Sequence, residues 1–238
     1  MVRVTPTIVI PAYNEGTNLS QFVPELMSRL DCWSRLSVII VDDGSTDTTG
    51  EVLRELSARY KNLHTICLQA NKGKAAALRV GFEAAIERQA DVVCMIDADG
   101  QDNPYFLNLM IQRVLTGTGL VTGRRVNRAE KLPKRLASKM FNVLVRLMTS
   151  TPGKDHNSGM KAMSADVAAF LIPFLEEDRH RYISVFAHWG GFALAERSVI
   201  NRPRISGRTK YSSSRIIVGT VDLLTLSRFF KTRRLTHE

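Results

Sequence analysis

Short apolar runs alternate with segments of helical periodicity through the first half of this 238-residue chain. The apolar runs are typical of buried strands, and the segments between them repeat apolar residues at helical spacing. The predicted strands are residues 7–10, 37–41, 64–68, 92–96 and 120–122, and the predicted helices are residues 17–30, 47–60, 73–88 and 104–115. This alternation predicts an α/β fold with a doubly wound, Rossmann-like, mostly parallel sheet flanked by helices.

The second half is basic and mostly helical. We predict an amphipathic helix over residues 131–148, then a loop over 149–158, a strand over 193–199, and helices over 164–175, 182–189 and 213–230. No internal repeat or low-complexity linker divides the sequence, so we expect a single domain over residues 1–238.

The charge balance favours polyanionic partners. Lysine and arginine number 33 against 23 acidic residues, which gives a net charge of +10. Glu130 is the only acid in residues 124–154, and Asp222 is the only acid in residues 197–234. Phosphate or a membrane surface is therefore expected to meet the second half. A nucleic-acid partner is not expected, because the basic runs lack the interleaved aromatic residues of single-strand binders.

The cysteines and the apolar stretches of the sequence indicate where in the cell the protein is expected. Cys32, Cys67 and Cys94 are far apart, which fits neither a disulfide framework nor a zinc site and predicts buried free thiols. No signal peptide is visible, and no stretch approaches the roughly 18–20 apolar residues of a membrane-spanning helix. We therefore expect a cytoplasmic protein that meets a membrane only peripherally, at its inner face.

Asp97-Ala98-Asp99-Gly100-Gln101 follows the predicted strand 92–96 directly. Ligands collect at the carboxyl ends of parallel strands, and Mg²⁺ or Mn²⁺ prefers oxygen ligands that it shares with substrate phosphates. Asp97, Asp99 and Gln101 are therefore candidate metal ligands. A simple turn followed by a helix cap is the alternative interpretation.

Three other loops carry polar residues after predicted strands. In Pro11-Ala12-Tyr13-Asn14-Glu15, Tyr13 could stack on a base and Glu15 could accept hydrogen bonds, or the loop could simply lead into a helix. In Asp42-Asp43-Gly44-Ser45-Thr46-Asp47, Ser45 or Thr46 is expected to cap the next helix, and Asp43 is the candidate for contact with a base. Asn71-Lys72-Gly73-Lys74 opens a helix, where it could bind an anion or present solvated lysines.

These four motifs, in this order, resemble those of the family 2 glycosyltransferases, which have the GT-A fold. Further along, the motifs at 123–125, 155–161 and 204–211 resemble the branch that transfers sugars to polyprenyl phosphates, the dolichol-phosphate mannose synthase-like enzymes. The resemblance implies a nucleotide-sugar-binding half (1–123) and an acceptor-facing half (124–238). It also implies that the donor is bound by Pro11, Ala12, Tyr13, Glu15, Asp43, Lys74, Asp97, Ala98 and Asp99.

The implied reaction is the inverting, metal-dependent transfer of a sugar from a nucleoside diphosphate sugar to a dolichyl- or undecaprenyl-type phosphate. A phosphomonoester has a second pKa near 6, so it is already nucleophilic at neutral pH without a protein base. The acceptor phosphate needs cations instead. The residues predicted to bind the acceptor phosphate are Arg125, Arg135, Ser138, Arg204 and Lys210, with Arg124 as an alternative to Arg125. The predicted catalytic residues are Asp99 and the four basic residues of that set, Arg125, Arg135, Arg204 and Lys210.

A hydroxyl acceptor is the competing hypothesis, and it requires a carboxylate base. The sequence Glu176-Glu177-Asp178 is the candidate base, although we interpret it first as a solvated helix end, because exposed charge runs are common. The lipid must be reached at a membrane, for which residues 131–148 and 213–230 are candidate interfacial helices. An integral membrane partner is also compatible with this sequence.

Overall fold

The computed structural model describes residues 4–126, 132–176 and 179–204, and within its fifth α-helix it describes side chains from Ser138 onward. The predicted helix over 213–230 lies outside the described residues.

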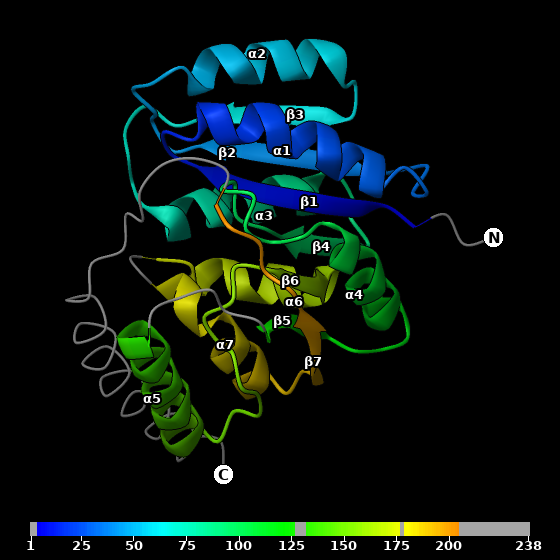
Figure 1. The fold of residues 1–238 in the computed structure, drawn as a ribbon. Helices are drawn as coiled ribbons and strands as arrows, with labels where there is room; N and C mark the ends of the chain where they lie inside the picture. The colour runs from blue at the N-terminus through cyan, green and yellow to red at the C-terminus, as the bar shows by residue number, and fades with distance from the viewer. Residues whose placement is uncertain (1–3, 127–131, 177–178, 205–238) are drawn as a thin grey trace.

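A seven-stranded sheet forms the centre of the described chain (Figure 1). Its order is β3-β2-β1-β4-β6-β5-β7, and β6 alone runs antiparallel to its neighbours. The strands are β1 (Pro6–Ala12), β2 (Ser37–Asp42), β3 (Leu63–Cys67), β4 (Val92–Met95), β5 (Leu120–Arg125), β6 (Lys161–Ser164) and β7 (Leu194–Val199). The mostly parallel sheet that we predicted is confirmed, and strands from both halves of the chain share it.

Helices cover both faces of the sheet. One face packs against α1 (Gly16–Arg29), α2 (Thr49–Arg59) and α4 (Tyr105–Leu115), and the other against α3 (Lys74–Glu87), α5 (Leu132–Thr149), α6 (Ala165–Leu171) and α7 (Ile183–Trp189). Two short 3₁₀ helices, η1 (Ile172–Phe174) and η2 (Arg179–Tyr182), complete the second layer.

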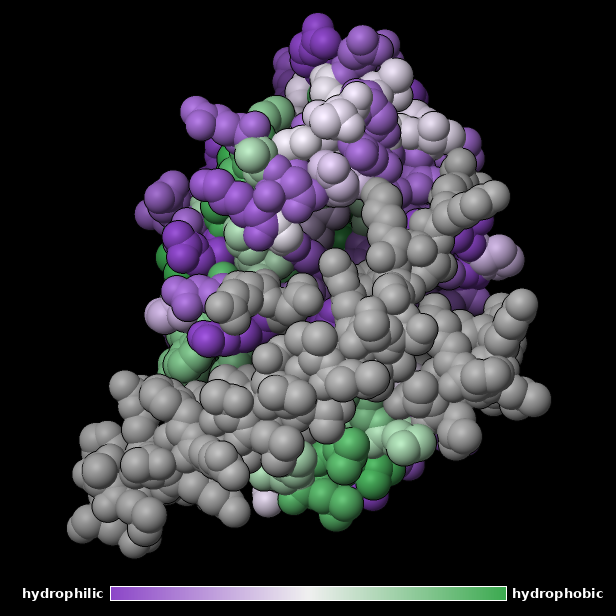
Figure 2. All heavy atoms as spheres, turned by 90° about the vertical axis from the view of Figure 1, so that its left-hand side faces the viewer, coloured by the Kyte–Doolittle hydropathy of each residue, from purple (hydrophilic) through white to green (hydrophobic). Residues whose placement is uncertain are grey.

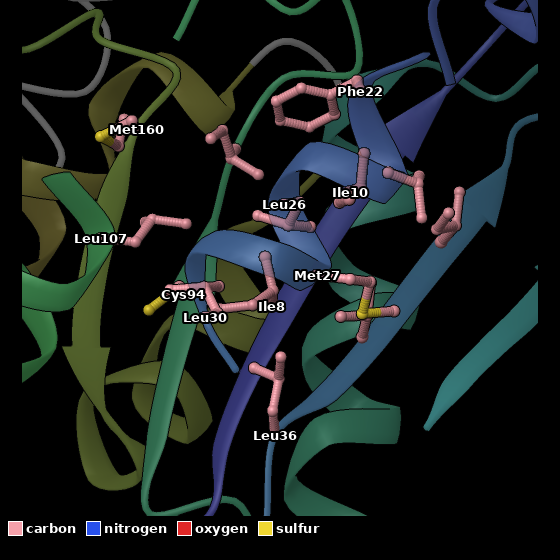
Figure 3. Packing of buried hydrophobic residues seen from close by; sticks show 14 of the residues in the cluster. Ile8, Ile10, Phe22, Leu26, Met27, Leu30, Leu36, Cys94, Leu107 and Met160 are labelled. Atoms are coloured by element: carbon pink, nitrogen blue, oxygen red, sulfur yellow. The ribbon is translucent and has the colours of Figure 1, made fainter. Parts of the chain in front are cut away.

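The two-sided cover explains why the central strands are continuous apolar runs rather than alternating ones. Consecutive residues Ile8, Val9 and Ile10 of β1 are all fully buried, with Ile8 and Ile10 facing one layer and Val9 the other. Figure 3 shows Ile8 and Ile10 packed among Phe22, Leu26 and other side chains of α1.

Three details differ from the predictions. The sequence analysis missed β6, which inserts between β4 and β5. Cys32 and Cys67 are exposed, and only Cys94 is buried as expected. Cys67 is exposed because β3 is the edge strand of the sheet, where its outer face has little cover.

Candidate active site

The carboxyl ends of β1, β2 and β4 lie side by side at one edge of the sheet, because these strands are parallel neighbours. The three motifs that follow these strands in the sequence therefore meet there, as is usual for ligand sites in parallel sheets. Figure 2 looks onto this side of the molecule, where polar residues occupy the upper part and an apolar area lies at the lower end.

Asp97 is held by the first residue of α3. The Nζ of Lys74 donates a hydrogen bond to Oδ1 of Asp97, and the Lys74 side chain is only 20% exposed. Lys74 is therefore not a solvated surface lysine, whereas Lys72 is exposed. Burial alone would raise the pKa of the Asp97 carboxyl, but the positive charges of Lys74, Arg125 and Lys161 lower it below its ordinary value. Asp97 is thus an ionised carboxylate.

Gly159 lies directly against the other side of this carboxylate. A Cβ atom at Gly159 would be 2.4 Å from Oδ2 of Asp97 and 2.6 Å from its Cγ. Only glycine allows this close approach, because any side chain at position 159 would overlap the Asp97 carboxylate.

Asp99 meets a cation from the far end of the described chain. Its Oδ2 accepts a hydrogen bond from Nη2 of Arg204 at 2.7 Å, and its Oδ1 accepts one from the backbone N–H of Gln101 at 3.0 Å. Burial and the negative charge of Asp97 raise the pKa of Asp99, against the opposing effect of Arg204. The two carboxylates therefore repel each other and require positive charge between them.

The next carboxylate in the chain, Asp102, is 4% exposed and lies close to the same pair. Burial, with the charge of Asp97, raises the pKa of Asp102 to about 7. Its Oδ1 accepts a hydrogen bond from Nδ2 of Asn201 at 3.0 Å. Asp102 therefore connects the carboxylate loop to the segment that carries Arg204.

The two carboxylates fit a divalent ion bound to a substrate diphosphate. Their oxygens are ligands that Mg²⁺ and Mn²⁺ prefer, and their mutual repulsion favours a bound cation. The described residues contain no cluster of three or more histidine, cysteine or acidic side chains arranged for a metal. Phosphate oxygens of a substrate would have to complete the coordination, as they do in many magnesium sites.

Asp43 organises the loop that precedes α3. Its carboxylate, 3% exposed, accepts the backbone N–H groups of Lys72 and Gly73, each at 2.8 Å. Gly73 has φ 90°, in the left-handed region, which turns the chain so that the helix can begin at Lys74. Asp43, predicted to contact a base, thus holds the loop that places Lys74 on Asp97.

The first two loops are tied together by Asn14. The backbone N–H of Asn14 donates to Oγ of Ser45 at 2.8 Å, and Oδ1 of Asn14 accepts the backbone N–H of Thr46 at 2.8 Å. Ser45 and Thr46 do not cap α2 as predicted, because the helix begins only at Thr49 and Thr48 is the residue that precedes it. Asp47 instead accepts the N–H of Thr49 at the start of that helix.

The remaining donor-side residues take the following positions. Pro11 and Ala12 end β1, Ala98 is buried between the two metal-ligand candidates, and Tyr13 is half-buried. Glu15 directly precedes α1 and accepts a hydrogen bond from Nδ2 of Asn18. All of these lie in the loops at the carboxyl edge of the sheet or directly beside them.

Arg124 and Arg125, which the sequence offered as alternatives for contact with the acceptor phosphate, have different partners in the structure. Arg125 donates from Nε and Nη2 to the two oxygens of Asp155, each at 2.9 Å, and Asp155 is 1% exposed. Arg124 donates to Oγ of Ser198 on the edge strand β7. Arg125 therefore belongs to the cluster around Asp97, and Arg124 does not.

Lys161 is a buried cation that the sequence analysis did not assign. It begins β6, is 1% exposed, and its Nζ donates to the carbonyl oxygens of His156 and Ser158. Burial lowers the pKa of the Lys161 ammonium to about 7. Lys161 thus ties down the loop that ends in Gly159. The motif at residues 155–161, which contains Lys161, was the signal for it in the sequence.

Asp155 and His156, which precede Gly159 in this loop, line a cavity of about 230 Å³. Thr122, Asp155, His156 and Glu196 are among its lining residues. Burial lowers the pKa of His156 to about 4, so this histidine is neutral at physiological pH.

Several predicted residues are not tested by these contacts. Lys210, Glu177 and Asp178 lie outside the described residues, as does the side chain of Arg135. Ser138 lies on α5, and its carbonyl accepts Nδ2 of Asn142 at 2.9 Å. Of the three acids proposed as an alternative base, the structure describes Glu176. Its side chain is 56% exposed, and its Oε2 lies 3.6 Å from Nη1 of Arg179.

Known proteins share this architecture. The structure is similar to glucosyl-3-phosphoglycerate synthase from Mycobacterium tuberculosis, solved with Mn²⁺, uridine diphosphate and phosphoglyceric acid, with a TM-score of 0.68, 20% identity, and coverage of 93% of this chain and 76% of that one. It is also similar to a mannosyltransferase from Pyrobaculum calidifontis, solved with GDP-Man and Mn²⁺, with a TM-score of 0.61, 18% identity, and coverage of 87% and 59%. These similarities confirm the predicted GT-A fold.

The sequence relatives are longer than this chain. The chain is 31% identical over 227 residues to the undecaprenyl-phosphate 4-deoxy-4-formamido-L-arabinose transferase of Pseudomonas fluorescens, covering 92% of this chain and 63% of the relative. It is 29% identical over 221 residues to the enzyme of the same name from Pectobacterium carotovorum, covering 92% and 66%. This chain thus spans about two thirds of the length of these relatives. The sequence profile of glycosyl transferase family 2 matches residues 7–202, which include all described strands except the first residue of β1, and the chain belongs to that family.

Proposed function

We propose that this chain transfers a sugar, with inversion, from a nucleoside diphosphate sugar to a polyprenyl phosphate at a membrane surface. The names of the sequence relatives supply the acceptor class, because those enzymes are undecaprenyl-phosphate sugar transferases. The site supplies an independent physical reason, which is its arrangement of opposite charges.

The contact between Arg204 and Asp99 carries the proposal. It brings a guanidinium from the basic second half to within 2.7 Å of a carboxylate that follows a central strand of the first half. A phosphate acceptor that attacks a phosphate-linked sugar brings two anions together, and their repulsion must be offset by nearby cations. A guanidinium beside the donor-side carboxylates is suited to this task, because it grips phosphate with two parallel hydrogen bonds.

Each group then has a defined part in the reaction. Asp97 and Asp99 would hold a divalent ion, which when bound offsets charge on the leaving diphosphate. Lys74 orients Asp97, and Asp43 orients Lys74 through its loop. Arg204 and Arg125, with Arg135, Ser138 and Lys210, would hold the acceptor phosphate with an oxygen directed at the sugar. The dianionic phosphate needs no protein base, because it is already deprotonated at neutral pH.

Helix α5 is the proposed contact with the membrane. Three apolar side chains point outward from it, with exposed fractions of 59% for Met140, 44% for Val143 and 71% for Leu147. Lys139 and Arg146 are exposed on the same helix, and α5 lies on the side of the molecule where Figure 2 shows the lower apolar area. Apolar and basic side chains on one exposed helix are typical of an interfacial helix that lies in an anionic membrane surface.

Among the helices of the described ranges, none is both long and apolar enough to cross a bilayer. We propose peripheral docking through the exposed apolar and basic side chains of α5, by a single domain whose two halves bind donor and acceptor. Purified protein mixed with protein-free anionic vesicles tests whether an integral membrane partner is also required.

Product formation tests the proposed reaction. Radiolabelled UDP- and GDP-sugars are incubated with the protein and vesicles that contain polyprenyl phosphate, with Mn²⁺, with Mg²⁺ and with EDTA. We expect metal-dependent transfer of label into the organic phase with one of these donors. Release of nucleotide without lipid product would instead indicate a different acceptor.

A further inference from the structure

The chain crosses the carboxyl edge of the sheet after β7, and we call residues 200–204 the crossing segment. The backbone N–H of Val126 donates to the carbonyl of Val199 at the end of β7. Two residues later, Asn201 forms an antiparallel bridge with Asp102, and the N–H of Arg202 donates to the carbonyl of Gln101 at 2.8 Å. Figure 1 shows this part of the chain in orange, rising from β7 toward α1. The crossing segment is therefore paired with the loop that carries Asp97 and Asp99.

An ion pair with α1 holds the side chain of Arg202 in the crossing segment. Nη1 and Nη2 of Arg202 donate to Oε1 and Oε2 of Glu25 on α1, at 2.8 and 3.0 Å. The two residues are 177 positions apart in the sequence. Both side chains are about one third exposed, so the pair contributes little to global stability. Its two-point geometry nevertheless restricts both the position and the direction of the crossing segment.

Anchoring Arg202 also restricts the position of Arg204, which lies two residues further along the chain. Arg204 reaches Asp99 from the end of the crossing segment, two residues beyond Arg202, which pairs with Gln101 through its backbone and with Glu25 through its side chain. Fixing the backbone of one flexible residue costs conformational entropy, which lowers a binding constant by about 10-fold. In an anchored segment this conformational entropy is already lost before the acceptor phosphate binds. In an unanchored segment it is lost on binding, which weakens the affinity for the phosphate.

We propose that Glu25 is a positioning residue for acceptor binding, which acts by anchoring Arg202 and so presents Arg204 to the acceptor phosphate. The inference rests on the proposed function, because it assigns Arg204 to that phosphate. Glu25 itself lies on a helix of the donor half, yet its effect is expected on the acceptor.

The test compares Glu25→Gln with the charge-swapped double variant E25R/R202E. Glu55→Gln is the matched control, because Glu55 is an exposed acid on the neighbouring helix α2. For E25Q we expect the KM for polyprenyl phosphate to rise about 10-fold, the cost of reordering one residue, with the KM for the nucleotide sugar unchanged. The double variant should restore most of the acceptor KM, and E55Q should match the wild type.

Hydrogen exchange of the Arg202 amide provides a readout that does not depend on the acceptor. This amide donates to Gln101, so its exchange should accelerate in E25Q while amides of β1 keep their wild-type rates. An unchanged exchange rate of the Arg202 amide in E25Q, or equal changes in the KM values for donor and acceptor, would overturn the proposal that Glu25 anchors the crossing segment. A wild-type protein that forms no lipid product would instead overturn the proposed function, so the two failures are distinguishable.

Discussion

Gly159 offers a direct way to displace one carboxylate of the site without altering any charged group. In Gly159→Ala the new Cβ would lie 2.4 Å from Oδ2 of Asp97, whereas ordinary contact begins at 3.4 Å, so the carboxylate must retreat by about 1 Å. Gly159 is not among the glycines with positive φ, so its backbone conformation accepts alanine and the effect is confined to this contact. The movement would also strain the hydrogen bond between Lys74 and Asp97.

A displacement of about 1 Å at a reacting centre costs on the order of 100-fold in rate. We expect kcat/KM for the nucleotide sugar to fall by about that factor in G159A, together with a weaker apparent affinity for Mn²⁺ in the presence of nucleotide. Overpacking should lower the free energy of unfolding by only about 1–3 kcal/mol, so the variant should remain folded. The assay is initial-rate kinetics over a Mn²⁺ titration, with thermal unfolding measured on the same samples.

Gly50→Ala is the control, because nothing lies within 4 Å of a Cβ built at Gly50 near the start of α2. It should leave activity unchanged and raise the free energy of unfolding by about 0.5–1 kcal/mol. If G159A were as active as the wild type, with the same Mn²⁺ dependence, the assignment of Asp97 to the metal-bound diphosphate would be refuted.

The remaining predictions concern the base, the membrane, the metal and the response to pH. Glu177→Gln and Asp178→Asn should retain activity, and a loss of about 100-fold or more would favour a hydroxyl acceptor with a protein base. Leu147→Glu should weaken binding to anionic vesicles in a flotation assay by roughly 10-fold or more, from lost burial of one leucine, with no change in thermal unfolding because the side chain is 71% exposed. EDTA should abolish turnover, and Mn²⁺ or Mg²⁺ should restore it; full activity in EDTA would contradict the metal assignment. The pKa of His156 is about 4 in the folded protein against an ordinary 6.5, so the unfolded state binds more protons between these values and stability is lost as pH falls through that range. His156→Gln should flatten that part of the curve of melting temperature against pH, and an unchanged slope would contradict the burial of a neutral histidine.

The alternation of apolar runs and helical segments predicted most of the fold correctly. The strands and helices of the first half have ends that differ from the predicted ones by only a few residues. This success has a physical cause, since strands covered on both faces must be apolar throughout, and crossover helices must bury one face.

The sequence analysis missed β6 for an equally physical reason. Its four residues, from Lys161 to Ser164, begin with a lysine and end with a serine, so they lack the apolar run of the other central strands. Lys161 is compatible with the sheet only because its ammonium group donates to two carbonyls of the preceding loop. That compensation is tertiary, and no local pattern reveals it.

The candidate site was also predicted only in part from the sequence. The positions of Asp97 and Asp99 followed from the end of a strand, but their partners come from distant segments. Lys74 is 23 residues from Asp97, and Arg204 is 105 residues from Asp99. The close approach of Gly159 is likewise visible only in space. Local sequence therefore identified the carboxylates, and the tertiary structure identified what holds them.

The central claim is that Arg204, beside the donor-side carboxylates, receives a phosphate rather than a hydroxyl acceptor. The most direct measurement compares polyprenyl phosphate with the matching polyprenol as acceptors, for the wild type and Arg204→Met, at saturating nucleotide sugar and Mn²⁺. We predict transfer to the phosphate alone, and a large loss of that transfer in R204M with the affinity for nucleotide sugar retained. Transfer to the free alcohol, or undiminished transfer to the phosphate by R204M, would contradict the claim.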